Sequence, residues 1–344
     1  MIPPPRSSRR SGPGALADRL AALPLTIESL SVGIDAIPVP GYYGDEPRPT
    51  AVAELAGARQ VGRGENVAWT PREQAAFAAA CAALELPAET AVGEVSELVR
   101  LHLADPYGRA AVEGAAIDLA LRQAGTNPFL LAERAPEPVA FCWSLESRPD
   151  PQPAVEEVLR ADPEARLKLD VPAAGWPRRT WEFLARTGRV VVIDFKREGE
   201  LDQVRLGHAW LPDAWIEDPP VDAASLDPSG PWRARVALDG YVLAVVDLDD
   251  PAIPPAAVNV KAPRVGGWLE ALRCMETCRR RGWHAYVGGM FEVGVGRAQA
   301  RVLAALWSPR AWNDLAPVRR STSEPRASSP LASAGHFLGF APAD

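Results

Sequence analysis

The sequence lacks the features of a membrane protein and of a nucleic-acid-binding protein. No uninterrupted apolar stretch among its 344 residues approaches the length of a membrane span. Its formal net charge of -7 gives no basic surface for nucleic acid, and basic residues form only short clusters such as Arg279 to Arg281. Residues 1–23 carry Arg and Pro but no apolar core before a cleavage site, so no signal peptide is predicted. We therefore expect a cytoplasmic protein that binds neither membranes nor nucleic acid.

Cysteine is also scarce. The four cysteines, Cys81, Cys142, Cys274 and Cys278, form no CxxC motif and have no histidine at ligand spacing. Cys274 and Cys278 would share one face of a helix, where two small packing residues are a better interpretation than half of a zinc site. The cysteines therefore predict packing rather than chemistry.

What the sequence does contain is a series of charged residues at a nearly constant interval. Lys168, Asp194, Glu217, Asp239 and Lys261 are separated by 26, 23, 22 and 22 residues, and each stands at the end of a short apolar run. The interval suits one strand plus one crossover helix, and continuous apolar runs are typical of parallel strands buried on both faces. In a (β/α) barrel the C-terminal strand ends form the mouth of the active site. The pattern therefore predicts a divalent-cation site of three carboxylates, flanked by two lysines that are candidate bases.

These motifs resemble those of the enolase superfamily, and specifically of its muconate-lactonizing subgroup. The subgroup pattern is KxK, DxN, an E before D or Q and P, DE, and a lysine in NxKxxxxGG. The matching segments are RLK at 166–168, DFK at 194–196, EDP at 217–219, DG at 239–240, and NVK at 259–261 followed by Gly266 and Gly267. GGMFEVGVGR at 288–297 resembles the seventh-strand motif of o-succinylbenzoate synthases and N-acylamino acid racemases.

The resemblance implies an α/β fold, a modified TIM (β/α)7β barrel with an N-terminal α+β capping domain. We expect a disordered segment at 1–23, the capping domain at 24–134, the barrel at 135–317, and a tail at 318–344 that joins the capping domain. A capping box at Thr70 and Glu73 predicts a helix start, and Gly125 is expected just past the end of a second helix. On that second helix, Glu113 and Asp118 are expected to make structural hydrogen bonds.

The resemblance also implies the chemistry of the site. Mg²⁺, or Mn²⁺, held by Asp194, Glu217 and Asp239 would bind a substrate carboxylate and neutralise the charge that develops when the α-proton is removed. Lys168 and Lys261 would face the α-carbon from opposite sides, with pKa values lowered by the cation and by burial. The residues expected to support the site or bind substrate are Arg166, Asp170, Lys196, Gly288, Gly289, Met290, and Tyr42 and Tyr43 in a loop over the barrel mouth.

The chain departs from the subgroup pattern at three positions. Arg166 stands for the first lysine of KxK, Lys196 for the asparagine of DxN, and Gly240 for the acid after Asp239. Lys196 adds a cation beside the metal site, and as a strand residue two positions beyond Asp194 it would point to the same side. We predict that it forms an ion pair with Asp170.

The same arrangement of lysines and metal supports several reactions, so the residues expected to contact the substrate decide among them. The GGM stretch favours an o-succinylbenzoate synthase, which dehydrates 2-succinyl-6-hydroxy-2,4-cyclohexadiene-1-carboxylate in menaquinone biosynthesis. Residues 313–316, NDLA, lack the DxD motif typical of dipeptide epimerases. An N-acylamino acid racemase is the alternative enzyme, and a diverged barrel that binds a ligand without turnover is the non-enzymatic alternative. In each enzymatic case the partner is a small-molecule carboxylate, and homo-oligomerisation stays open.

Overall fold

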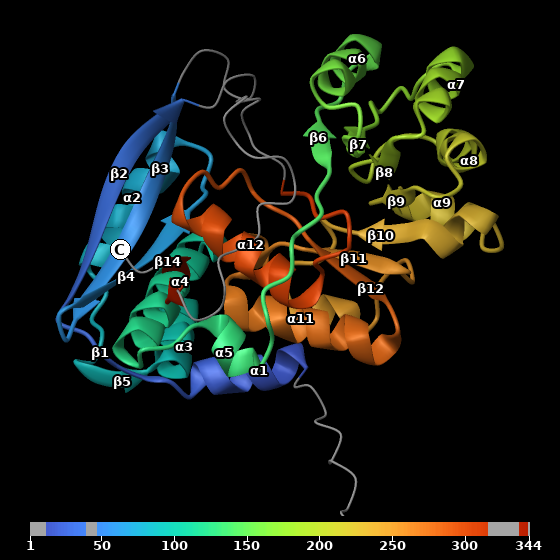
Figure 1. Cartoon of the computed structure of the whole chain (residues 1–344). Coiled ribbons are helices and arrows are strands. Elements are labelled where there is room, and N and C mark those ends of the chain that lie inside the picture. Colours follow the sequence, from blue (N-terminus) through green and yellow to red (C-terminus); the bar gives the residue numbers. More distant parts are fainter. Residues whose placement is uncertain (1–11, 39–46, 316–336, 343–344) are drawn as a thin grey trace, which may run out of the picture.

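The computed structural model describes residues 12–38, 47–315 and 337–342, which form a capping layer and a parallel sheet of barrel strands (Figure 1). The capping layer has a three-stranded antiparallel sheet in the order β2-β3-β4 and a separate β1-β5 pair. Its elements are α1 (Pro13–Ala21), β1 (Pro24–Thr26), β2 (Ser29–Pro38), β3 (Pro47–Gly57), β4 (Gln60–Asn66), α2 (Pro71–Ala82), β5 (Glu89–Ala91), α3 (Val92–His102), α4 (Pro106–Gln123) and α5 (Pro128–Ala132).

Local sequence signals set the ends of the capping helices. At the start of α2, Thr70 Oγ1 accepts the Glu73 N–H (3.2 Å) and Glu73 Oε2 accepts the Thr70 N–H (2.8 Å), which confirms the capping box. α4 begins after the N-cap Asp105. Gly125, just beyond that helix, has a φ of 62°, the left-handed conformation that favours glycine at a helix end.

α4 packs closely on β4 because two positions on one face of this strand, Gly62 and Gly64, carry no side chain. A Cβ at Gly62 would lie 2.2 Å from the carbonyl oxygen of Ala115, and one at Gly64 would lie 2.0 Å from that of Ala111. Glycine at both positions therefore lets the backbones of helix and strand approach each other.

The N-terminal helix α1 corrects the expectation that residues 1–23 are disordered. Residues 1–11 lie outside the described part of the chain, but Pro13–Ala21 forms a helix in which Leu16 and Leu20 are fully buried. These leucines are four residues apart and so lie on one face of the helix. Their burial offsets the conformational entropy that ordering this segment costs.

The barrel sheet contains seven parallel strands in the order β6-β7-β8-β9-β10-β11-β12. Backbone bridges join Asn313 to Phe141, which precedes β6, and Asp314 to Gly288, which follows β12. The segment of Asn313 and Asp314 thus closes the ring of pairings, as the (β/α)7β architecture requires. The strands are β6 (Trp143–Leu145), β7 (Leu167–Asp170), β8 (Val190–Asp194), β9 (Trp215–Glu217), β10 (Val236–Leu238), β11 (Ala257–Val260) and β12 (His284–Val287).

Helices cover the outside of the barrel strands, with α6, α7 and α8 outside β6 to β8 (Figure 1). After β10 the crossover contains only the short η2, and Pro251, Pro254 and Pro255 interrupt the segment before β11. The helical elements are α6 (Gln152–Ala161), α7 (Arg178–Thr187), α8 (Leu201–Trp210), α9 (Val221–Leu226), η1 (Pro231–Arg235), η2 (Val245–Leu248), α10 (Ala262–Val265), α11 (Trp268–Arg281) and α12 (Val295–Trp307). None of the described helices combines the length and the apolar character that crossing a membrane requires.

Buried carboxylates of the capping layer bind the N-terminal ends of two barrel helices. Glu65 on β4 accepts the N–H groups of Val293, Gly294 and Gly296 at 2.9, 3.0 and 3.0 Å, around the start of α12. Glu113 on α4 accepts the Leu269 N–H at the start of α11 (3.0 Å). A negative charge at a helix N-terminus is favourable because it compensates unpaired N–H groups. Glu113 therefore has the structural role that the sequence predicts.

The C-terminal segment packs against the capping helix α4. It forms the pair β13 (Phe337–Leu338) and β14 (Ala341–Pro342). Asp118 of α4 accepts the N–H groups of Phe340 (2.9 Å) and of Arg63 on β4 (3.0 Å), so it too has a structural role. The Phe340 ring is buried against Trp268, with 4.6 Å between ring centroids.

Candidate active site

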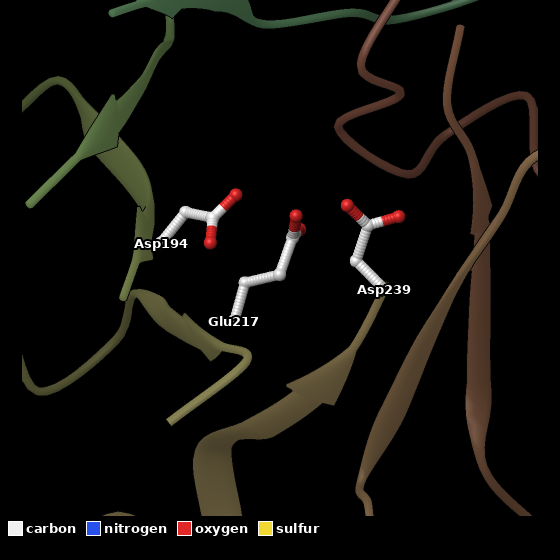
Figure 2. Close-up of side chains that lie close together, drawn as sticks. All are labelled: Asp194, Glu217 and Asp239. Carbon is white, nitrogen blue, oxygen red and sulfur yellow. The ribbon is translucent and has the colours of Figure 1, made fainter. Parts of the chain in front are cut away.

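Three carboxylates meet at the C-terminal ends of β8, β9 and β10. Asp194 and Glu217 end their strands and Asp239 follows β10 directly. Figure 2 shows the three side chains pointing toward one another, and one carboxylate oxygen of each lies within 4.8 Å of the others. All three residues are at most 3% exposed. Hard oxygen ligands at this spacing fit a divalent cation such as Mg²⁺, so the donor set agrees with the ion that the sequence predicts.

Lys168 reaches the cluster from β7. Its Nζ contacts Glu217 Oε1, and it lies 3.1 Å from Asp194 Oδ2 and 3.0 Å from Asp314 Oδ2. The side chain is 1% exposed. Burial alone would lower the pKa of Lys168, but the carboxylates of Asp314, Glu217 and Asp194 together raise it well above its usual value. In this arrangement Lys168 is a charged hydrogen-bond donor.

Lys261 reaches the cluster from the opposite side, directly after β11. Its Nζ lies 2.9 Å from Asp239 Oδ2, while the guanidinium of Arg264 on α10 contacts Asp239 Oδ1. Burial raises the pKa of Asp239, but the nearby Lys261 and Arg264 outweigh burial and lower it below the usual value for an aspartate. Lys168 and Lys261 therefore flank the three carboxylates, as the sequence predicts.

Lys196 binds the carboxylate of Asp194 with both its backbone and its side chain. Its N–H donates to Asp194 Oδ1 (2.9 Å) and its Nζ lies 2.5 Å from Asp194 Oδ2. Nζ also lies 3.2 Å from Asp170 Oδ1, which confirms the predicted ion pair. The reason given for that pair was wrong, because β8 ends at Asp194 and Lys196 has a left-handed φ of 53°. This turn, rather than strand alternation, directs the side chain back over Asp194.

Glu217, the central carboxylate, has further buried partners. The Tyr286 hydroxyl on β12 donates to Glu217 Oε2, and Asn259 Nδ2 on β11 lies 3.3 Å from the same oxygen. Burial raises the pKa of Glu217 well above its usual value, and the negative charges of Asp194 and Asp239 add to this. Positive charge at the centre of the cluster is therefore strongly favoured.

Asp218, which follows Glu217, holds the backbone on which Asp239 is placed. Its carboxylate accepts the N–H groups of Asp239 (2.7 Å) and Gly240 (2.6 Å). Burial and the neighbouring Asp239 raise the pKa of Asp218 to about 6. A Cβ at Gly240 would lie 2.9 Å from Asp218 Oδ2, so the glycine that replaces the subgroup's acid leaves room for this contact.

The GGM segment contacts the Lys261 side of the cluster. A Cβ at Gly288 would lie 2.5 Å from Lys261 Cε, and the Gly289 N–H donates to the Asp314 carbonyl (3.0 Å). Met290 Sδ lies 3.6 Å from Arg264 Nη2. Glycine at 288 is therefore required for the side chain of Lys261 to occupy its position.

Two sets of predicted residues are not placed at the cluster. The Arg166 guanidinium donates to the Gly188 carbonyl (3.0 Å) and lies over the Trp312 ring, 5.3 Å from its centroid. Arg166 precedes β7 and Gly188 precedes β8, so this contact lies at the N-terminal end of the strands, opposite to the end that carries the carboxylates. Tyr42 and Tyr43 lie outside the described residues.

The residues at the cluster that were not predicted as site residues include Arg264, Tyr286 and Asp314. Two of them carry a weak signal in the sequence. Arg264 stands three residues after Lys261, about one helical turn, so the two side chains can lie on one side. Tyr286 stands two residues before Gly288, so strand alternation places Tyr286 and Gly288 on one face. For Asp314 the signal is only its place at the end of the eighth strand.

Family comparisons cover both parts of the chain. Residues 135–320 match the family described as "Domain of unknown function (DUF8230) C-terminal domain", and residues 18–130 match the corresponding N-terminal domain. The chain is 29% identical over 230 residues to an o-succinylbenzoate synthase of Enterococcus faecalis, covering 63% of this chain and 60% of that protein. It is 41% identical over 73 residues to an N-succinylamino acid racemase of Amycolatopsis sp, covering 21% of this chain and 17% of that protein. The alignments thus span less than two thirds of these relatives.

Solved structures show the same fold over most of the chain. A member of the enolase superfamily from Enterococcus faecalis V583 has a TM-score of 0.72 and 22% identity, covering 92% of this chain and 94% of that one. A dipeptide epimerase from Methylococcus capsulatus, complexed with Mg and the dipeptide L-Arg-D-Lys, has a TM-score of 0.71 and 22% identity, covering 85% of this chain and 91% of that one. At this identity the likeness establishes the fold.

Proposed function

We propose that this chain, which belongs to the DUF8230 family, is a Mg²⁺-dependent o-succinylbenzoate synthase of the enolase superfamily. Its reaction would be the dehydration of 2-succinyl-6-hydroxy-2,4-cyclohexadiene-1-carboxylate to o-succinylbenzoate. The observation that carries the proposal is the placement of Lys168 and Lys261 on either side of three buried carboxylates. The relatives named o-succinylbenzoate synthase support the choice of this reaction.

Asp194, Glu217 and Asp239 would hold the cation, whose charge would bind the substrate carboxylate and stabilise the negative charge that forms on it. The same positive charge would weaken the hold of these carboxylates on Lys168, whose pKa would fall toward the range of a useful base.

The two lysines would have unequal tasks in the dehydration. Lys168 Nζ would take the α-proton, so that the C–H bond breaks, and would return that proton to the leaving hydroxyl as the C–O bond breaks and water departs. Lys261, held at 2.9 Å from Asp239 Oδ2, would stay protonated and stabilise the charge on the opposite face. The reaction needs no oxidant and no further reactant.

The direct test is to incubate the full chain with the cyclohexadiene carboxylate and MgCl₂ and to follow formation of o-succinylbenzoate. We expect turnover that disappears with a chelator and returns when Mg²⁺ is restored. If the substrate persists at all metal concentrations, this function is rejected.

The second candidate is an N-acylamino acid racemase, favoured by the presence of a lysine on each side of the cluster and by the short alignment with the Amycolatopsis racemase. It would exchange the α-proton of N-succinylamino acids with D₂O, which proton NMR detects. Exchange without dehydration selects this candidate. Absence of both activities would favour a barrel that binds a ligand without turnover.

A further inference from the structure

Lysine is confined to the candidate site in this chain. Of the 37 basic residues, 34 are arginine and three are lysine, namely Lys168, Lys196 and Lys261. Each of the three lies within ion-pair distance of Asp194, Glu217 or Asp239. An ammonium is a compact point charge, whereas the guanidinium of arginine is a planar fork, so the two are not interchangeable between close carboxylates. Lys196 therefore differs in kind from the chain's surface cations.

The backbone places Lys196 on Asp194. Lys196 and Arg197 have φ values of 53° and 69°, a left-handed conformation that non-glycine residues rarely adopt and that costs free energy. This conformation lets the Lys196 N–H donate to Asp194 Oδ1 (2.9 Å) while the ammonium lies 2.5 Å from Asp194 Oδ2. Both oxygens of a candidate metal ligand are thus bound by one residue.

A second carboxylate, that of Asp170, lies close to the Lys196 ammonium. Asp170 ends β7 beside Asp194 in the sheet register, and its Oδ1 lies 3.2 Å from Lys196 Nζ. The Lys196 side chain is 45% exposed, against 1% for Lys168 and 7% for Lys261. Of the three lysines it has the most freedom to change its partner.

We propose that Lys196 is a resident counter-ion, which neutralises Asp194 when the divalent ion is absent and shifts to Asp170 when the ion binds. The proposal rests on the divalent-cation site of the proposed function. It makes Lys196 a competitor of Mg²⁺ and Asp170 the residue that relieves the competition. Removing the Lys196 charge then tightens Mg²⁺ binding, and removing Asp170 weakens it.

The test is calorimetric titration of the chelator-treated full chain with MgCl₂. Lys196→Gln keeps most of the side chain and removes the charge. We expect it to bind Mg²⁺ about tenfold or more tightly than wild type, because no positive side chain then competes with the ion for Asp194. The matched control is Arg197→Gln, in the same turn, since Arg197 lies over the Tyr241 ring and forms no ion pair with a carboxylate among the residues that the structure describes. We expect the control to change the affinity less than about threefold.

Asp170→Asn completes a double-mutant cycle. We expect it to weaken Mg²⁺ binding by a larger factor in wild type than in the Lys196→Gln background, where no displaced ammonium needs a partner. Where wild type binds Mg²⁺, equal factors in the two backgrounds, or a Lys196→Gln variant that binds Mg²⁺ no more tightly than wild type, overturn the proposal.

Failure of the metal site itself is distinguishable by a second measurement. Thermal unfolding in chelator reports the counter-ion role without metal, and we expect Lys196→Gln to lower Tm by about 2 °C or more relative to Arg197→Gln. If no variant binds Mg²⁺ but this difference appears, the metal-dependent function fails while the counter-ion role stands. If wild type binds and neither affinity nor Tm responds to Lys196→Gln, the counter-ion role alone fails.

Discussion

The two outer carboxylates of the cluster are held in different ways. Asp239 contacts Lys261 and Arg264, whose side chains are 7% and 18% exposed. Asp194 contacts the buried Lys168 and also Lys196, which is 45% exposed. The Asp239 side is thus a closed ion-pair group, whereas the Asp194 side includes one cation near solvent.

The difference matters because a buried charge is costly unless a partner remains. Lys168 also contacts Glu217 and Asp314, and Lys196 also contacts Asp170. In the part of the chain that the structure describes, Lys261 and Arg264 pair only with Asp239. The Asp194 side can therefore lose a charge and reorganise, and the Asp239 side cannot.

The largest expected effect compares the two buried lysines in the dehydration assay. Lys168→Ala should lower the rate by about 10³-fold or more, because both proton transfers pass through this residue. Lys261→Arg keeps the positive charge and should retain a measurable fraction of activity. Circular dichroism checks that both variants are folded. A loss as large in Lys261→Arg as in Lys168→Ala would instead indicate a proton donor on each face, as a racemase requires.

A smaller effect concerns stability. Asp239→Asn leaves Lys261 and Arg264 without their carboxylate and should destabilise the chain in chelator by about 3 to 5 kcal/mol. Asp194→Asn should cost about 1 to 3 kcal/mol, since Lys168 and Lys196 keep other partners. Urea unfolding measures both values. Equal losses would show that the two sides do not differ in the way described.

The smallest effect is a pH dependence on the Asp239 side. The pKa of Asp218 is raised from 3.8 to about 6, so its stabilising contribution is full below pH 3.8 and is lost as the pH rises through about 6. Relative to Asp218→Asn, wild type should therefore lose about 1 to 3 kcal/mol of unfolding free energy between pH 4 and pH 7. Parallel stability profiles for the two proteins across this range would contradict the prediction.

The strand ends were predictable from sequence because their order and interval follow from the repeating βα unit. Asp194, Glu217 and Asp239 converge for that reason alone, and the flanking lysines follow from the same register. Side-chain partners were less predictable. Lys196 reaches Asp194 through a left-handed turn that strand alternation does not foresee.

Contacts between residues far apart in the sequence were not predicted, for a different reason. Asp314 meets Lys168 across 146 residues, and nothing local to either residue encodes the pairing. Arg166 shows the converse, since its motif position suggested the site whereas its long side chain bonds the Gly188 carbonyl instead. Arg166 stands before the start of β7, so its place in the motif does not put its side chain at the end of the strand that carries the carboxylates.

The carboxylate of Glu65 has a consequence for how the molecule folds. Its three N–H partners lie 228, 229 and 231 residues further along the chain, and Asp118 meets the Phe340 N–H across 222 residues. Contacts of such separation form late, because the intervening chain must first close a long loop. During synthesis the capping layer therefore emerges before the partners of two carboxylates that are buried in the folded protein. Glu65 lacks its hydrogen bonds until α12 is made, and Asp118 lacks its bond to Phe340 until the C-terminal segment is made. We therefore expect this chain to fold slowly, with the edges of the parallel sheet exposed until these contacts form.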